Sequence, residues 1–277
     1  MAPTTNRRNI MLRLAALGLL ALWPAALGAQ QGTITYTHSI NMDLELPPEL
    51  AMMDLGEIPS AMSRDLLLHF DPSASLMVPA PIGKRENGNK KVEVMEVAMF
   101  AEMAMFMASS GMNIGGKLTR TEAPALESYI DLADGRIVET HEFMGRTFRV
   151  VDERPEYQWR LTGEQAVHLG YMVIKATAEH DSTAIEAWFT PEIPVGAGPG
   201  PYGGLPGMIL VLSADDGHIK YFATEIALGD VEEGLIKMPD EGKEMSKEEY
   251  DKVVAEKMEE MRKLMGGRIR GIGGGGR

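Results

Sequence analysis

Four methionines recur at strict intervals of four in a mainly apolar stretch: Met95, Met99, Met103 and Met107. On an α-helix this spacing places the four thioethers in one slowly drifting row. Because soft sulfur ligands favour Cu(I), one hypothesis is a copper(I)-handling protein that uses a methionine-rich helix. We favour another interpretation, in which the methionines fill a core or line an apolar ligand site, since methionine adapts to irregular apolar gaps. We therefore expect no cofactor.

Other patterns that could carry catalysis are incomplete. Residues 198–203, GPGPYG, have the letters of the GxGxxG dinucleotide-binding loop, but its prolines have no N–H to offer a pyrophosphate. His141-Glu142 lacks the second histidine that a zinc protease helix needs. The sequence has no G-x-S-x-G elbow, no phosphate-binding P-loop and no cysteine nucleophile. We therefore expect a protein that is not an enzyme.

The loop between Thr190 and Met208 has the composition of a functional element. It contains six glycines and five prolines, and LPGM at 205–208 suits a type II turn, so the loop should be stiff. One hypothesis is that it forms the rim of a site for an apolar ligand. The other is that it closes one end of a sheet, with Leu205 and Tyr202 as plugs. The candidate ligand-binding residues are Tyr202, Leu205, Pro206, Met208, Trp188, Phe100, Met103 and Phe106.

The first residues indicate where the protein works. Residues 1–29 combine a basic start, an apolar run from Leu14 to Trp23, a proline and a small-residue end, which is the pattern of a secretory signal peptide. The apolar run is about half the length that crosses a bilayer. Without cysteine, the chain has no disulfide and no residue for a bacterial lipid anchor. We expect export to the periplasm or secretion, with no lipid anchor and no membrane span after cleavage.

The elements that must position these residues are mostly strands. Between residues 30 and 229, short runs of alternating apolar and polar residues are separated by turn sequences such as Asp134-Gly135. This pattern is typical of β-hairpins and predicts an antiparallel meander rather than a parallel sheet. The formal net charge of −13 argues against nucleic acid as a partner, because an acidic chain repels phosphate.

Residues 230–277 differ from the region before them. An acidic linker without a clear pattern precedes Ser246 and Glu249, which have the spacing of a helix capping box. An apolar stripe at spacings of three and four follows, so we expect an amphipathic helix that ends at Gly266 and then a disordered Gly/Arg tail. This helix either docks on the protein's own sheet, stays loosely tethered, or binds a partner.

The string GLPGMIL at 204–210, preceded by AWFTPEIPVGAGP, resembles the GLPGLI family of exported proteins, which are mostly found in Bacteroidetes. The similarity extends to QGTITY near the mature start, to LLLHFDPSASLM and to the strand around Trp159. The sequence departs from the family in Met208, in its methionine-rich insert and in its charged C-terminus. The resemblance implies a periplasmic or secreted β-rich domain. It transfers no catalytic residue, because the family has no established activity.

These observations predict three regions: a signal peptide at 1–29, a GLPGLI-like β-rich domain at 30–229, and an acidic linker, helix and tail at 230–277. We expect a mainly β or α+β fold. Its curved antiparallel sheet would form an open half-barrel, similar in outline to lipoprotein-carrier domains, with one or two packed helices and a C-terminal helix.

A trough of this kind with a stiff loop at its rim suits an apolar ligand. We therefore expect a non-catalytic protein that binds a lipid-like or peptide ligand or assists an outer-membrane system. The alternatives are copper(I) handling and a structural role in an envelope complex. The possible partners are an apolar small molecule or an envelope protein.

Overall fold

The computed structural model describes residues 30–41, 61–81 and 125–272. The predicted signal peptide and the methionine row lie outside these residues, as do the candidate site residues Phe100, Met103 and Phe106. The one or two packed helices that we expect before residue 125 also fall outside the described part. The hypotheses that rest on them stay predictions.

The described residues form twelve strands, a short 3-10 turn and one long α-helix. The elements are β1 (Gly32–Asn41), β2 (Ala61–Phe70), β3 (Ala74–Pro79), β4 (Glu127–Asp131), β5 (Arg136–Phe143), β6 (Arg146–Glu153), β7 (Arg160–His168), β8 (Tyr171–His180), β9 (Thr183–Thr190), β10 (Met208–Ala214), η2 (Asp215–Gly217), β11 (Ile219–Leu228), β12 (Lys243–Ser246) and α3 (Lys247–Ile272).

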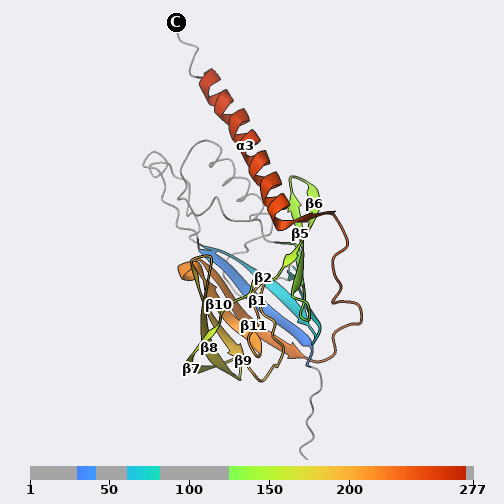
Figure 1. Ribbon diagram of the computed structural model, residues 1–277, viewed down its shortest axis with the longest axis vertical. Coiled ribbons are helices and arrows are strands. Elements are labelled where there is room, and N and C mark those ends of the chain that lie inside the picture. The colour runs from blue at the N-terminus through green and yellow to red at the C-terminus, as the bar shows by residue number, and fades with distance from the viewer. Residues whose placement is uncertain (1–29, 42–60, 82–124, 273–277) are drawn as a thin grey trace, which may run out of the picture.

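All twelve strands belong to one sheet (Figure 1), in the order β12-β6-β5-β4-β3-β2-β1-β11-β10-β9-β8-β7. Each neighbouring pair is antiparallel except β12 and β6, which are parallel. The mainly β class and the antiparallel sheet with a C-terminal helix are therefore confirmed.

Short turns join many of the neighbouring strands, as the sequence predicts. Met144-Gly145 and Asp181-Ser182 each connect two strands and have positive φ at both positions. Type I′ hairpin turns require this backbone conformation, and their twist matches that of the flanking strands. The local turn sequences thus determine which consecutive strands pair.

The connection between β6 and β7 requires the sheet to curl. These strands are separated by ten strand-to-strand steps in the sheet order, which would be about 48 Å in a flat sheet. Residues 154–159 join them, and an extended connection of that length spans about 25 Å at most. The two ends of the sheet must therefore approach each other across an open trough, as Figure 1 shows.

The inner face of the sheet is the face that carries Ile34, Tyr36 and His38 of β1. Buried residues alternate with half-buried ones through most of this strand, as expected when one face packs on a core. The first core cluster consists of Ile34, Tyr36, Leu66, Leu68, Phe70, Met77, Val173, Ile193, Val195, Ala197, Met208, Leu210 and Ala223. The second core cluster consists of Ala176, Ile185, Ala187, Phe189, Leu205, Ile209, Leu212 and Ala214.

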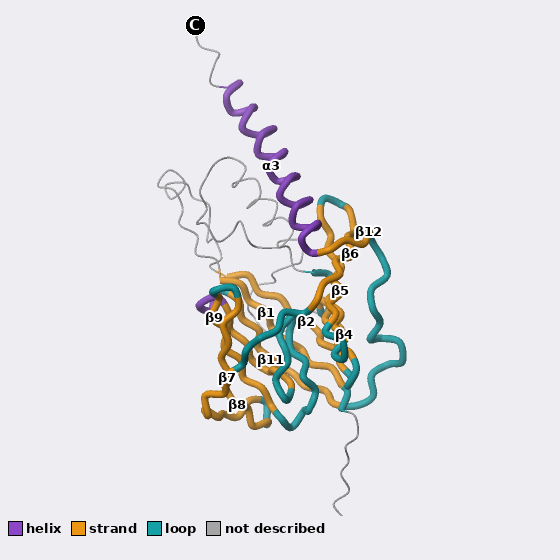
Figure 2. The backbone as a smooth tube through the Cα atoms, in the orientation of Figure 1, coloured by secondary structure: helices purple, strands orange, loops and turns teal. Residues whose placement is uncertain are grey.

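The Gly/Pro loop between β9 and β10 is part of this core. Ile193, Val195 and Ala197 are buried in the first core cluster, and Leu205 is buried in the second. Figure 2 shows the loop in teal, folded back against the sheet. Among the described residues, this loop has no regular secondary structure, yet its side chains help to fill the trough.

Backbone hydrogen bonds hold the loop in this position. Gly204 N–H donates to the carbonyl of Gly196 at 3.0 Å, and Ile209 N–H donates to Ala197 at 3.1 Å. From the sheet, the hydroxyl of Tyr36 donates to the carbonyl of Ile209 at 2.5 Å. The loop is fixed at several points along its length, which agrees with the stiffness predicted from its composition.

The C-terminal helix begins where the sequence predicts. Glu249 N–H donates to the Ser246 hydroxyl at 3.2 Å, and Ser246 N–H donates to the Glu249 carboxylate at 3.0 Å, which completes the capping box. Tyr250 and Met245 pack with Phe143, Phe148 and Val150 of β5 and β6 in a third core cluster. The remainder of α3 points away from the sheet (Figure 1).

Two expectations for this region are wrong. The linker is not wholly without structure, because its last residues form β12 beside β6. The helix also continues past Gly266 to Ile272. Glycine costs about 1 kcal/mol in a helix but does not forbid helical backbone angles, so a glycine pair alone need not end one. No described helix is long and apolar enough to cross a membrane.

Candidate functional site

Five aromatic side chains form a continuous row on the inner side of the trough. His38 stacks on Tyr221 with ring centroids 4.3 Å apart. Tyr221 meets Tyr202 edge to face at 6.2 Å, and Tyr202 stacks on Tyr157 at 5.5 Å. Tyr157 then lies 5.5 Å from Trp159. We call His38, Tyr221, Tyr202, Tyr157 and Trp159 the aromatic row.

Four separate parts of the chain position the aromatic row. His38 and Tyr221 are opposite each other in the register of β1 and β11. Tyr157 and Trp159 come from the segment that crosses between β6 and β7, and Tyr202 comes from the Gly/Pro loop. The indole N–H of Trp159 donates to the carbonyl of Gly203 at 2.8 Å. This bond ties the crossing segment to the loop.

The phenols of the row are neutral at physiological pH. Burial is the main cause that raises the pKa of Tyr157, Tyr202 and Tyr221 above the usual value. Each of the three side chains is only partly covered. They therefore present uncharged rings and hydroxyl groups, which suit the apolar part of a ligand together with a few hydrogen bonds.

Two arginines accompany the aromatic row. Arg64 of β2 is opposite His38 in the strand register. Arg154 lies against the Gly/Pro loop, so close that a β-carbon added at Gly203 would be 2.9 Å from its Nη1. Burial lowers the pKa of both guanidinium groups. The Nε of Arg64 and the Nη1 of Arg154 are buried and have no hydrogen-bond partner.

Our sequence reasoning missed these arginines, although Arg64 left a signal. It precedes Leu66, Leu68 and Phe70 at intervals of two, and in a strand that spacing places all four residues on one face. An arginine on a face that is otherwise apolar marks either a strand end or a functional group. Arg154 left no such signal, because its position depends on the packing of two loops.

The described residues that the sequence predicts to bind a ligand do not lie together in one site. Tyr202 is in the aromatic row, with Leu205 buried beneath it in the second core cluster. Met208 is fully buried in the first core cluster, whereas Pro206 is exposed. Trp188 of β9 is half-buried and packs against the first core cluster, away from the aromatic row. Its indole stays close to Lys175, at 5.6 Å, and donates to Glu186.

His38 should make the stability of the protein depend on pH. Burial, assisted by the charge of Arg64, lowers the pKa of His38 to about 4. The folded state keeps the ring of His38 neutral, whereas the unfolded chain binds a proton below its pKa of about 6.5. The free energy of unfolding is therefore at its full value above pH 6.5 and falls as the pH falls toward 4. We expect the free energy of unfolding to decrease by about 3 kcal/mol over this range because of His38 alone.

Urea unfolding at pH 7.0 and pH 4.5 measures this effect. The variant His38→Phe keeps a ring to stack on Tyr221 but cannot bind a proton, so its stability should fall much less at pH 4.5. Equal pH dependence in wild type and His38→Phe would contradict the assignment.

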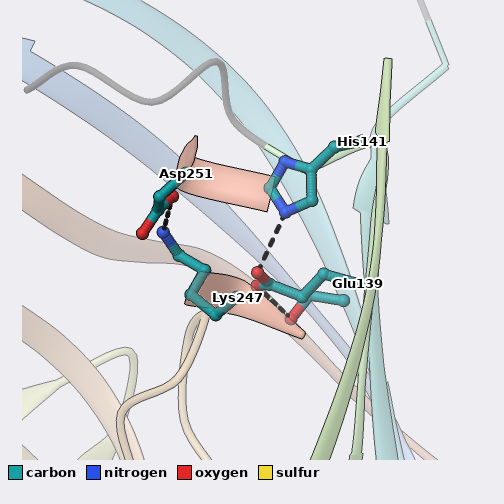
Figure 3. Close-up of polar contacts among 5 residues, drawn as sticks. Glu139, His141, Lys247 and Asp251 are labelled. Atoms are coloured by element: carbon teal, nitrogen blue, oxygen red, sulfur yellow. Dashed lines mark hydrogen bonds and ion pairs between the residues drawn. The ribbon is translucent and has the colours of Figure 1, made fainter. Parts of the chain in front are cut away.

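A second polar group lies under the start of α3 (Figure 3). Glu139 accepts a hydrogen bond from the Ser128 hydroxyl at 3.0 Å and lies 3.1 Å from Nε2 of buried His141. The ring of His141 packs 4.9 Å from that of Tyr250, and Lys247 pairs with Asp251 one helical turn along α3. Because Glu139 separates the serine from the histidine, the histidine cannot activate the serine as in a hydrolase triad.

The described residues contain no group of three or more His, Asp or Glu side chains that could hold a metal ion. Asp134, Arg136, Val151, Asp152 and Glu153 line an open hollow at the end of β6. Its charged lining does not suit an apolar ligand. Among the described residues, the aromatic row and its two arginines are therefore the best candidate for a binding site.

Comparison with known proteins supports the resemblance over part of the chain. The model of the GLPGLI family, described as "Protein of unknown function (Porph_ging)", matches residues 174–211. The match begins in β8 and includes the whole Gly/Pro loop and the first residues of β10. A search of curated proteins gives no match.

Two solved structures of PNGF-II, in different space groups, are similar to this chain at 15% sequence identity. Their TM-scores are 0.47 and 0.49, and each alignment covers 81% of this chain. The alignments cover 33% and 32% of the PNGF-II chains, so this chain spans about a third of their length.

Proposed function

We propose that the protein is an exported, non-catalytic member of the GLPGLI family that binds a lipid-like or peptide ligand along the aromatic row. The observation that carries this proposal is the row itself. Five half-buried or buried rings from β1, β11, the crossing segment and the Gly/Pro loop meet on one side of the trough. Continuous aromatic surface of this kind is suited to apolar groups.

The rigidity of the surroundings supports binding. The Trp159 indole is bonded to the loop, Gly200 N–H approaches the sulfur of Met77 at 3.4 Å, and loop residues pack in both core clusters. Because these parts are held in place before a ligand arrives, little conformational entropy is lost on binding. A preformed surface favours recognition over a chemical step, for which the described residues offer no suitable set of groups.

A neutral fluorescent probe tests the proposal directly. The mature protein should bind N-phenyl-1-naphthylamine, and Tyr202→Ala should weaken the binding about tenfold by removing the central ring of the row. Tyr129→Ala is the matched control, because this half-buried tyrosine of β4 lies on the outer face, next to inward-facing Ser128. Circular dichroism checks that both variants are folded.

Mass spectrometry of protein purified from its own cell envelope provides the second measurement. The intact mass should correspond to cleavage after Gly28 or Ala29, and native spectra should contain a bound apolar molecule. A ligand-free mass combined with no binding of the probe would overturn the proposed function. An uncleaved mass would overturn the proposed export.

A role as a structural partner in an envelope complex is the second candidate. It is favoured by α3, whose first turn is anchored at Tyr250 while its later turns extend away from the sheet. Deleting residues 256–277 keeps the anchored turn and removes the projecting part. If the helix recruits a partner, envelope proteins that co-purify with the full chain should be lost from this variant.

A further inference from the structure

The aromatic row has a cationic side chain near each end. Arg154 lies beside the Gly203-Gly204 backbone and close enough to Tyr157 to lower the pKa of that phenol, against the larger opposite effect of burial. At the other end, Arg64 is opposite His38 in the strand register and interacts with Tyr221. The aromatic surface between them is therefore bounded by positive charge on both sides.

Neither arginine forms an ion pair within the described part of the chain. Two other cations of the sheet that are less than a quarter exposed are paired: Arg149 forms an ion pair with Glu244, and Lys175 lies 2.9 Å from Glu186. In contrast, no described carboxylate pairs with Arg64 or Arg154, and each has a buried nitrogen without a hydrogen-bond partner. A partly desolvated guanidinium in this condition is costly, because buried charges are normally paired.

We propose that the ligand of the aromatic row carries a carboxylate, and that this group binds Arg154. This inference rests on the proposed function and specifies the chemistry of its ligand. The planar guanidinium matches a carboxylate through two parallel N–H···O bonds, which are stronger than neutral hydrogen bonds. The apolar part of the ligand then lies on Tyr157, Tyr202 and Tyr221 in the direction of Arg64.

Nearby acidic groups limit how much negative charge the site accepts. Asp215 is close enough to raise the pKa of Tyr202, and Glu139 acts in the same direction on Tyr221, in each case after burial. These carboxylates would repel a ligand with several negative charges, such as a polyphosphate. A single carboxylate on a largely apolar molecule, as in a fatty acid, fits this balance of charges best.

Calorimetric titration compares the affinities of decanoate and decanol, which share an alkyl chain but differ in the carboxylate. Both are used below the concentration at which decanoate forms micelles. Wild-type protein should bind decanoate about tenfold more tightly than decanol. Arg154→Met keeps the apolar stem of the side chain and should remove this preference while decanol still binds. Arg160→Met is the matched control, because Arg160 is exposed on β7 and should leave both affinities unchanged.

Arg154→Met should remain folded, because the substitution removes a charge that has no partner, and thermal unfolding of each variant verifies this. Arg154→Lys keeps the charge without the planar fork and should retain only part of the preference. Equal binding of decanoate and decanol by wild type would overturn the carboxylate site but leave the proposed function standing. If neither compound bound, both proposals would be overturned.

Discussion

The variant Gly207→Ala should lose a large share of the stability of the protein. A β-carbon at this position would overlap the carbonyl oxygen of Thr190 and lie 2.9 Å from Cα of Pro191. Both obstacles are backbone atoms, and Thr190 is fully buried, so neither can move aside without disturbing the end of β9. We expect the free energy of unfolding to fall by about 3 kcal/mol, a large share of what a typical domain has.

Urea unfolding followed by tryptophan fluorescence measures this loss. Pro206→Ala is the neighbouring control, because Pro206 is exposed and its replacement should cost less than about 1 kcal/mol through the greater freedom of the unfolded chain. An unchanged unfolding midpoint for Gly207→Ala would show that the close approach of residues 190 and 207 is wrong. The close contact with Thr190 explains why the second glycine of the GLPG string, Gly207, cannot carry a side chain.

The variant Ile193→Ala tests whether the Gly/Pro loop is part of the core. Ile193 is fully buried among residues of β1, β2, β8 and β10. Truncating such a side chain removes apolar contacts and leaves a cavity, so we expect a loss of about 3 kcal/mol in the free energy of unfolding. A loop that only covered the surface would give an effect below about 0.5 kcal/mol.

Pro194→Ala is the control for this measurement. Pro194 is adjacent to Ile193 but exposed, so its replacement should change stability only slightly. Comparable effects of the two substitutions would mean that burial of Ile193 contributes nothing specific. A large effect of Ile193→Ala alone would make the loop as much a part of the fold as the strands.

The features that could be predicted from sequence are those that depend on neighbouring residues. Alternating apolar and polar residues in QGTITY predict the buried and exposed faces of β1, and turn sequences predict the hairpins. The pair Ser246 and Glu249 predicts where α3 begins. These signals act within a few residues, so a single sequence contains them completely. The mainly β, antiparallel class follows from them.

The features that could not be predicted depend on contacts between distant segments. Nothing near Ile193 or Val195 indicates that their side chains pack beneath a loop rather than point to solvent. The aromatic row likewise combines four segments, and Tyr157 and Tyr221 become neighbours of Tyr202 only after the sheet has curled. Sequence therefore suggested the correct loop but only Tyr202 of the row.

The centre of the sheet has a consequence for biogenesis. β1, the first described strand, lies between β2 and β11, so its partner on one side is made only when the ribosome has passed residue 228. Until then its polar backbone edge remains open, and a nascent or truncated chain exposes a site for aggregation. A chain that ends before β11 should therefore aggregate even when every earlier strand is present.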